Sequence, residues 1–232
     1  MITEERITLV ARLLAIFVVL YLFELTNFTL SIDDEFAAFR QDHIVWAQQG
    51  RWVAYLLERF VVTQPTLPYL PILVFGIGIS LGYSLLSSGH GLTDKKYFLF
   101  ILFPVFAIFP TWFYLVSFRP NIFHCGLGVC LTCYAISSFA FEIRQHDKSK
   151  ILSYETLRLL PASLALALAV GLYQSFYLFF VAACLGIFLI DLIDRKRLPE
   201  TASVAAFGFI CLFGFVFYAL AQKIVLRTSG GE

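Results

Sequence analysis

Three adjacent carboxylates stand where a long apolar stretch of the chain ends. Asp33, Asp34 and Glu35 lie within "TLSIDDEFAAFRQDH", residues 29–43. A carboxylate in such a place can act as a general base on a hydroxyl group, and a pair of them can hold a divalent cation. Three neighbouring negative charges also repel each other, most strongly where water is partly excluded. The cluster therefore calls for a compensating cation or for a role in chemistry.

Helix capping is the alternative interpretation of this cluster. Ser31 and Asp34 have the spacing of a capping box, and acidic residues in a first turn interact favourably with the helix dipole. Each effect is worth about 0.3 to 2 kcal/mol, enough to explain one or two acids but not three. Arg40 and Arg51 are candidates for charge compensation. Both interpretations stay open at this level.

Other polar residues fall near the same side of the chain's apolar stretches. Glu24 lies inside the first stretch, where a carboxylate is costly unless it faces a cavity or a partner. It could also be protonated or hydrogen-bonded to a neighbouring helix. Arg119, Tyr173 and Gln174 mark two further turns, and Tyr173 could be an interface anchor alone. For His124, one turn deeper, a structural histidine is the favoured interpretation.

Composition defines the class of protein that positions these residues. Of 232 residues, 59% are hydrophobic and only 14% are charged, whereas soluble domains carry about 25% charged residues. The net charge of +1 gives no indication of nucleic-acid binding. Five cysteines lie within apolar runs, which favours free thiols over a disulfide framework. The chain is thus predicted to be an integral membrane protein.

About 20 apolar residues are needed to cross a bilayer as a helix, and the chain offers roughly seven such stretches. They are residues 7–30, 67–86, 97–117, 122–141, 157–172, 174–193 and 202–221. The first is too long for a signal-peptide core and has no cleavage site of small residues. The prediction is an all-α polytopic bundle that forms a single integral membrane domain over residues 1–232.

Basic residues predict the orientation of the bundle. They concentrate in three short connections on one side, around residues 95–96, 144–150 and 195–197, and the positive-inside rule assigns that side to the cytoplasm. The N-terminus is then cytoplasmic. The long connection over residues 31–66, which carries the acidic cluster, faces outward, into the periplasm of a Gram-negative cell.

The outer connection itself is expected to be helical, with a break at Gly50. In its second half, Val53, Leu56, Leu57, Phe60 and Val61 fall on one arc, and Ala54 and Glu58 lie opposite. This pattern is typical of a helix that lies in the membrane interface rather than crossing it.

A first apolar stretch followed by "SIDDEFAAF", "WAQQGRW" and later "GLYQSF" resembles a family of membrane glucosyltransferases. These are the serotype-converting enzymes of the GT-C class, which modify bacterial O-antigen in lipopolysaccharide. The resemblance implies a polyprenyl-phosphate sugar as donor, typically undecaprenyl phosphate glucose, a polysaccharide acceptor, and a place in the bacterial inner membrane.

The resemblance also implies roles for individual residues. The catalytic base falls on Asp33 or Asp34, with Glu35 as helper. Donor phosphate or sugar contacts fall on Arg40, Arg51 and Trp52, and the facing wall on Tyr173 and Gln174. Glu24 and Arg119 complete the expected substrate-binding set. GT-C enzymes differ in metal use, so Mg²⁺ or Mn²⁺ on Asp33 and Asp34 stays open.

The length of the chain raises a further expectation. Members of this family are usually longer, with more spans after the seventh, so the chain resembles an N-terminal part of the family architecture, a compact relative, or half of a two-chain or oligomeric enzyme. The sequence leaves two other functions open besides glucosyl transfer. One is a transporter or flippase for a lipid-linked sugar, and the other is a truncated, non-catalytic membrane scaffold.

Overall fold

The structure, a computed structural model, describes residues 4–27, 43–61, 69–90, 96–116, 119–145, 156–195 and 200–230. Every regular element in these ranges is a helix. The helices are α1 (Glu4–Leu20), α2 (Leu22–Thr26), α4 (Ile44–Gln48), α5 (Trp52–Phe60), α6 (Leu70–Gly89), α7 (Lys96–Ala107), α8 (Pro110–Val116), α9 (Arg119–Gln145), α10 (Thr156–Leu172), α11 (Ser175–Arg195) and α12 (Thr201–Thr228). The predicted all-α fold is confirmed.

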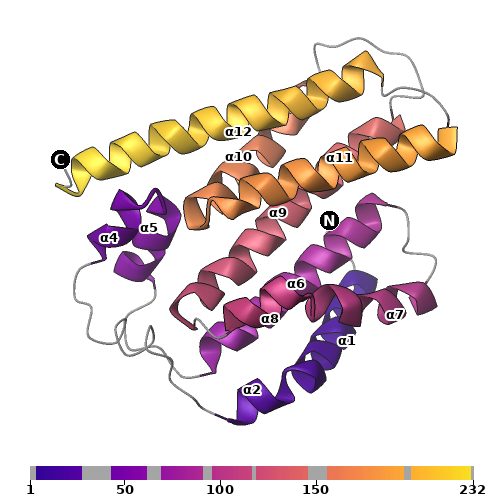
Figure 1. Cartoon of the computed structure of the whole chain (residues 1–232), viewed down its shortest axis with the longest axis horizontal. Helices are drawn as coiled ribbons and strands as arrows, with labels where there is room; N and C mark the ends of the chain where they lie inside the picture. Colours follow the sequence, from indigo (N-terminus) through magenta and orange to yellow (C-terminus); the bar gives the residue numbers. More distant parts are fainter. Residues whose placement is uncertain are drawn as a thin grey trace.

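Helix α9 runs through the middle of the molecule and joins its two halves (Figure 1). Helices α1, α6, α7 and α8 gather around its first half, and α10, α11 and α12 around its second half. Two clusters of buried side chains follow this division: Ile122 and Val129 of α9 belong to the first, and Ile136 and Phe139 to the second. One helix is therefore a wall of both cores.

Glycine allows the closest approach in the bundle, between α6 and α9. A Cβ atom added at Gly78 would meet the backbone oxygen of Gly126 at 2.0 Å, and one added at Gly126 would meet the Cα of Phe75 at 2.6 Å. Small residues at such contacts let helix backbones pack directly, which matters in a bilayer because lipid is as apolar as the side chains. The pairing of α6 with α9 depends on these two residues.

Four helical segments in the described part of the chain are long and apolar enough to cross a membrane. They are Leu70–Gly89, Ile122–Ile143, Ser175–Ile193 and Thr201–Thr228. A shorter apolar helix covers Leu159–Leu172. These five segments match five of the seven predicted stretches, but the count of seven spans is not confirmed. The segments on α11 and α12 are only 17% buried, so most of their apolar surface faces outward.

The other two predicted stretches are broken into shorter helices. The first is interrupted at Tyr21, whose hydroxyl donates a hydrogen bond to the carbonyl oxygen of Ala107 at 2.8 Å. The third ends at Ala107 and resumes at Pro110, because proline cannot donate to the preceding turn and suits the start of a helix. The break before Pro110 leaves pieces of 12 and 7 residues, shorter than the roughly 20 residues of a full crossing. At Tyr21 the backbone hydrogen bonds from Tyr21 N–H to Phe17 O and from Leu25 N–H to Tyr21 O continue through the break.

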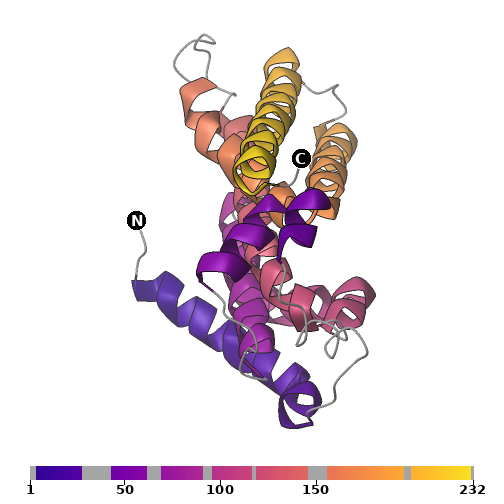
Figure 2. The same cartoon turned by 90° about the vertical axis from the view of Figure 1, so that its left-hand side faces the viewer.

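The outer connection contributes α4 and α5, which pack against the C-terminal end of α12 and against α10 (Figures 1 and 2). The expected break at Gly50 is confirmed, since α4 ends at Gln48 and α5 begins at Trp52. A small core holds the pair in place: Trp46, Ala47, Ala54 and Tyr55 bury against Val225 of α12. The two short helices thus belong to the bundle rather than to open solvent.

We expect Gly78→Ala to destabilise the protein, because the new methyl group has no room against the Gly126 carbonyl. Overpacking of this kind costs about 1–3 kcal/mol. Thermal unfolding of the purified protein in detergent measures the loss. Gly208→Ala on α12 is the matched control, since nothing lies within 4 Å of its added Cβ. If both variants unfolded at the wild-type temperature, the close contact of α6 with α9 would be refuted.

Candidate functional site

Helix α5 buries one face against the protein and exposes the apolar residues at its C-terminal end, while Trp52 and Leu56 pack partly buried against the small core. Ala54, Tyr55 and Glu58 are buried, whereas Phe60 and Val61 are largely exposed. An exposed apolar arc agrees with a helix that lies at a membrane interface. The consequence is that the one carboxylate of α5 points into the molecule. Sequence reasoning did not select Glu58 as a site residue.

Three partners surround the Glu58 carboxylate. The indole Nε1–H of Trp46 donates to Oε2 at 2.7 Å, and His43 Nδ1 lies 3.0 Å from the same oxygen. His124 Nε2 lies 3.7 Å from the other oxygen, Oε1. Glu58 is only 5% exposed. A buried carboxylate is tolerated when donors such as these compensate for lost water.

His124 joins the outer helices to the bundle. It sits on the first half of α9, is 4% exposed, and packs edge-on against the Trp46 ring at 6.2 Å between centroids. The favoured interpretation from sequence was a structural histidine. The contact with Glu58 agrees with that interpretation and adds a specific partner, which could be seen only in three dimensions.

Arg51 lies between two aromatic rings. Its guanidinium carbon is 4.2 Å from the centroid of the Tyr173 ring and 5.1 Å from that of Trp46. Burial lowers the pKa of the Arg51 side chain, and the electrostatic effects of Tyr173 and Cys125 oppose that change. Arginine stays charged even so, because its ordinary pKa lies above about 12. The result is a partly dehydrated cation held flat between aromatic faces.

Two glutamines tie the turn between α4 and α5 to the rest of the bundle. Gln174 Nε2 donates to the carbonyl oxygen of Gln49, and Gln222 Nε2 on α12 donates to that of Ala47. Trp52 lies against the end of α10, where a Cβ added at Gly171 would meet its Nε1 at 2.6 Å. Arg51 is thereby held beside the turn from α10 to α11.

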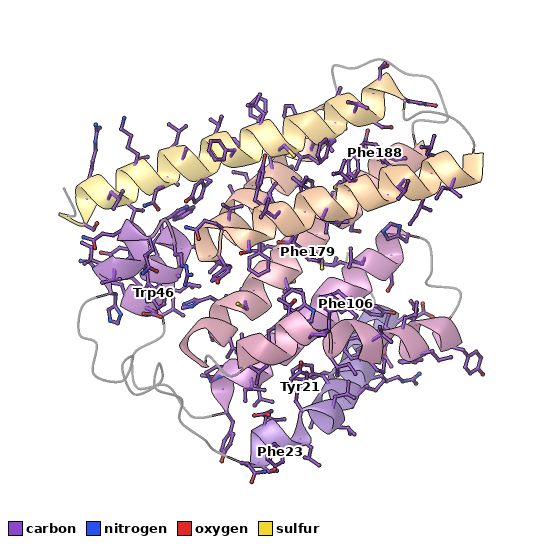
Figure 3. All side chains as sticks on the ribbon, in the orientation of Figure 1. Tyr21, Phe23, Trp46, Phe106, Phe179 and Phe188 are labelled. Carbon is purple, nitrogen blue, oxygen red and sulfur yellow. The ribbon has the colours of Figure 1, made fainter. Side chains whose placement is uncertain are left out.

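A cavity of about 750 Å³ opens beside Tyr173. Its lining is almost entirely apolar and comes from α6, α7, α8, α9 and α11, with Phe106 on α7 and Phe179 on α11 among its walls (Figure 3). Tyr173 and Cys125 also line it, and Tyr173 is the residue on which Arg51 stacks. The volume falls in the range of small-molecule sites, about 300–1,000 Å³. Tyr173 thus connects this apolar space to the positive charge of Arg51, which does not itself line it.

The structure brings together four of the residues that the sequence selected: Arg51, Trp52, Tyr173 and Gln174. Glu24 lies on α2, away from α4 and α5 in both views (Figures 1 and 2), so its predicted place in the same site is not supported by the geometry. Arg119 is the first residue of α9, and its side chain is outside the described part.

The acidic cluster Asp33, Asp34 and Glu35, together with Arg40, lies outside the described residues. Its expected role is therefore neither supported nor opposed by the geometry. Among the described residues, no group of three or more His, Cys, Asp or Glu side chains is arranged to hold a metal ion. Binding of Mg²⁺ or Mn²⁺ at Asp33 and Asp34 therefore stays an open alternative from the sequence.

The fold and the site define an all-α membrane protein in which a buried polar cluster and an arginine stacked on Tyr173 lie near an apolar cavity. A family model described as glucosyl transferase GtrII matches residues 22–232. The chain belongs to this glucosyl transferase family, and the resemblance drawn from its motifs is confirmed. Searches of curated proteins and of solved structures found no match.

We expect Gly50→Ala to loosen the α4–α5 segment. Gly50 has φ 82°, and an added Cβ would lie 2.6 Å from both Gln174 Nε2 and Tyr218 Oη. Left-handed backbone alone costs about 1–2 kcal/mol for other residues. Gly230→Ala is the matched control, with φ 75° and open space around its Cβ. Hydrogen–deuterium exchange over residues 43–61 should rise only in the Gly50 variant, and equal exchange in both would contradict this packing.

Proposed function

We propose that this protein is a membrane glucosyltransferase that moves glucose from a polyprenyl-phosphate donor to a surface polysaccharide such as O-antigen. Membership of the glucosyl transferase family supports sugar transfer as the activity. The apolar helices support a membrane location, and the distribution of basic residues supports a cytoplasmic N-terminus with residues 31–66 on the outer face of the inner membrane.

The observation that carries the proposal is the stacking of Arg51 on Tyr173, a residue that lines the cavity. A polyprenyl-phosphate sugar has a long apolar chain and an anionic phosphate next to the sugar. The cavity offers apolar walls for the chain, and the guanidinium offers a fork of donors that matches phosphate oxygens. Tyr173 belongs to both parts, because it lines the cavity and its ring stacks against the Arg51 guanidinium. A single polyprenyl-phosphate sugar would place its apolar chain in the cavity and its phosphate at Arg51.

The proposed reaction is a single displacement with inversion. The acceptor hydroxyl oxygen attacks the anomeric carbon of glucose while the bond from that carbon to the phosphate oxygen breaks. The bonding electron pair leaves with the polyprenyl phosphate, whose added negative charge Arg51 stabilises. The acceptor proton passes to the carboxylate of Asp33 or Asp34, with Glu35 and Arg40 as supporting groups. Trp52 and Gln174 are proposed to contact the sugar.

We expect Asp33→Asn or Asp34→Asn to abolish most of the glucose transfer, because the amide cannot accept the acceptor proton. A general base contributes about 10²–10⁴-fold to a rate. The assay follows radiolabelled glucose from polyprenyl-phosphate glucose into acceptor polysaccharide with the full chain in proteoliposomes. Glu200→Gln, at the exposed start of α12, is the control. If both Asp variants kept wild-type transfer, the assigned base would be wrong.

We expect Arg51→Gln to reduce kcat/KM for the donor by about 10²–10³-fold, the usual effect of losing one group that stabilises developing charge. Arg51→Lys should recover only part of this, since lysine lacks the planar fork. Arg59→Gln is the matched control, because Arg59 is an exposed arginine of the same helical segment that bonds Tyr55 instead. Movement of the donor across the vesicle membrane without glucose transfer would instead support the transporter interpretation.

A further inference from the structure

We infer that Glu58 is the positioning residue of this site: it fixes Trp46, and through the Trp46 ring it aims the Arg51 guanidinium at the donor phosphate. The inference rests on the proposed function for the identity of that phosphate. Nothing in the motifs of the sequence singles out Glu58, and its role follows from the contacts of the described residues alone.

The contacts form a continuous chain from the carboxylate to the cavity. Glu58 Oε2 accepts the indole N–H of Trp46 at 2.7 Å. The ring of Trp46 lies 5.1 Å from the guanidinium carbon of Arg51, which lies 4.2 Å from the centroid of Tyr173. Tyr173 lines the cavity. Each member is therefore in contact with the next, and the chain reaches the cavity through Arg51 and Tyr173.

The orientation of Trp46 depends on the carboxylate because an indole can only donate. The side chain is 8% exposed, so a rotated ring would lose its bond to Glu58 inside the protein rather than exchange it for water. The backbone N–H of Arg51 also donates to the carbonyl of Trp46 at 2.8 Å. The two residues are thus joined at the backbone and again where the guanidinium meets the ring, so that a shift of Trp46 carries Arg51 with it.

His124 fixes the position of Glu58, and with it Trp46 and Arg51, relative to the cavity. Its Nε2 lies 3.7 Å from Glu58 Oε1, and the next residue of α9, Cys125, lines the cavity. His43, at the start of α4, contacts Oε2 from the partly exposed side. Glu58 is accordingly held between the outer helices and α9, which is the arrangement needed for a group that transmits position and does not itself meet the substrate.

A double-mutant cycle tests the inference with the full chain in proteoliposomes. We expect Glu58→Gln to raise the KM for polyprenyl-phosphate glucose about tenfold, with a smaller change in kcat and none in the KM for the acceptor. If Glu58 acts through Arg51, the double variant Glu58→Gln with Arg51→Gln will be no worse than Arg51→Gln within about twofold. Trp46→Phe, which keeps a ring but removes the N–H, should reproduce the donor-specific effect. Glu58→Asp should recover part of the affinity.

Glu142→Gln is the matched control, since Glu142 is a buried carboxylate on the other half of α9. In the double variant, the fold-change caused by Glu142→Gln should multiply the fold-change caused by Arg51→Gln, as expected for independent sites. The inference is overturned if Glu58→Gln multiplies in the same way, or if it raises the KM for the acceptor as much as that for the donor. Should Glu58→Gln not fold, the cycle is made with Trp46→Phe, and the same two outcomes decide.

A binding measurement separates this inference from the proposed function. Polyprenyl phosphate alone is titrated into the same variants by calorimetry, with no sugar transferred. If the wild-type protein transfers no glucose but binds this lipid, and the two substitutions are non-additive in Kd, the proposed function fails and the positioning role stands. Additive losses of lipid affinity would remove the positioning role whatever the outcome of the transfer assay.

Discussion

A single buried carboxylate ties the outer helices of this protein to its membrane bundle. Burying a negative charge beside apolar helices is costly, and the cost is offset only when hydrogen-bond donors meet it in the folded state. Glu58 accepts the indole N–H of Trp46 on α4, lies 3.0 Å from His43 Nδ1 just before α4, and lies 3.7 Å from His124 Nε2 on α9. Because these segments are far apart in sequence, satisfying one charge fixes where the α4–α5 pair sits, and with it Arg51.

Helix α9 contributes residues both to the polar cluster around Glu58 and to the lining of the apolar cavity. Its successive residues His124 and Cys125 face different neighbours, the first meeting Glu58 and the second lining the cavity. The same helix packs directly on α6 through Gly78 and Gly126 and contributes to both cores. This central helix therefore holds the polar cluster around Glu58 and the apolar cavity in fixed relation to each other.

Much of the fold could be predicted because the bilayer imposes simple rules on composition. Low charge, long apolar runs and free cysteines indicated an all-α membrane bundle, and Gly50 and Pro110 coincide with observed breaks. The count of seven spans was less secure. Apolar length alone does not reveal where a helix stops, and the interruptions at Tyr21 and before Pro110 divide two of the stretches into shorter helices.

By itself, the sequence determined the family motifs. It also selected Arg51, Trp52, Tyr173 and Gln174, which lie close together because the start of α5 and the turn from α10 to α11 meet at one end of the bundle. It could not reveal Glu58. An amphipathic pattern identifies two faces of a helix but not which of them meets protein, and a charge opposite an apolar arc is ordinarily expected in water. In the folded protein Phe60 and Val61 are exposed and Glu58 is buried, so the tertiary structure placed the carboxylate inside, against partners that only folding brings within reach.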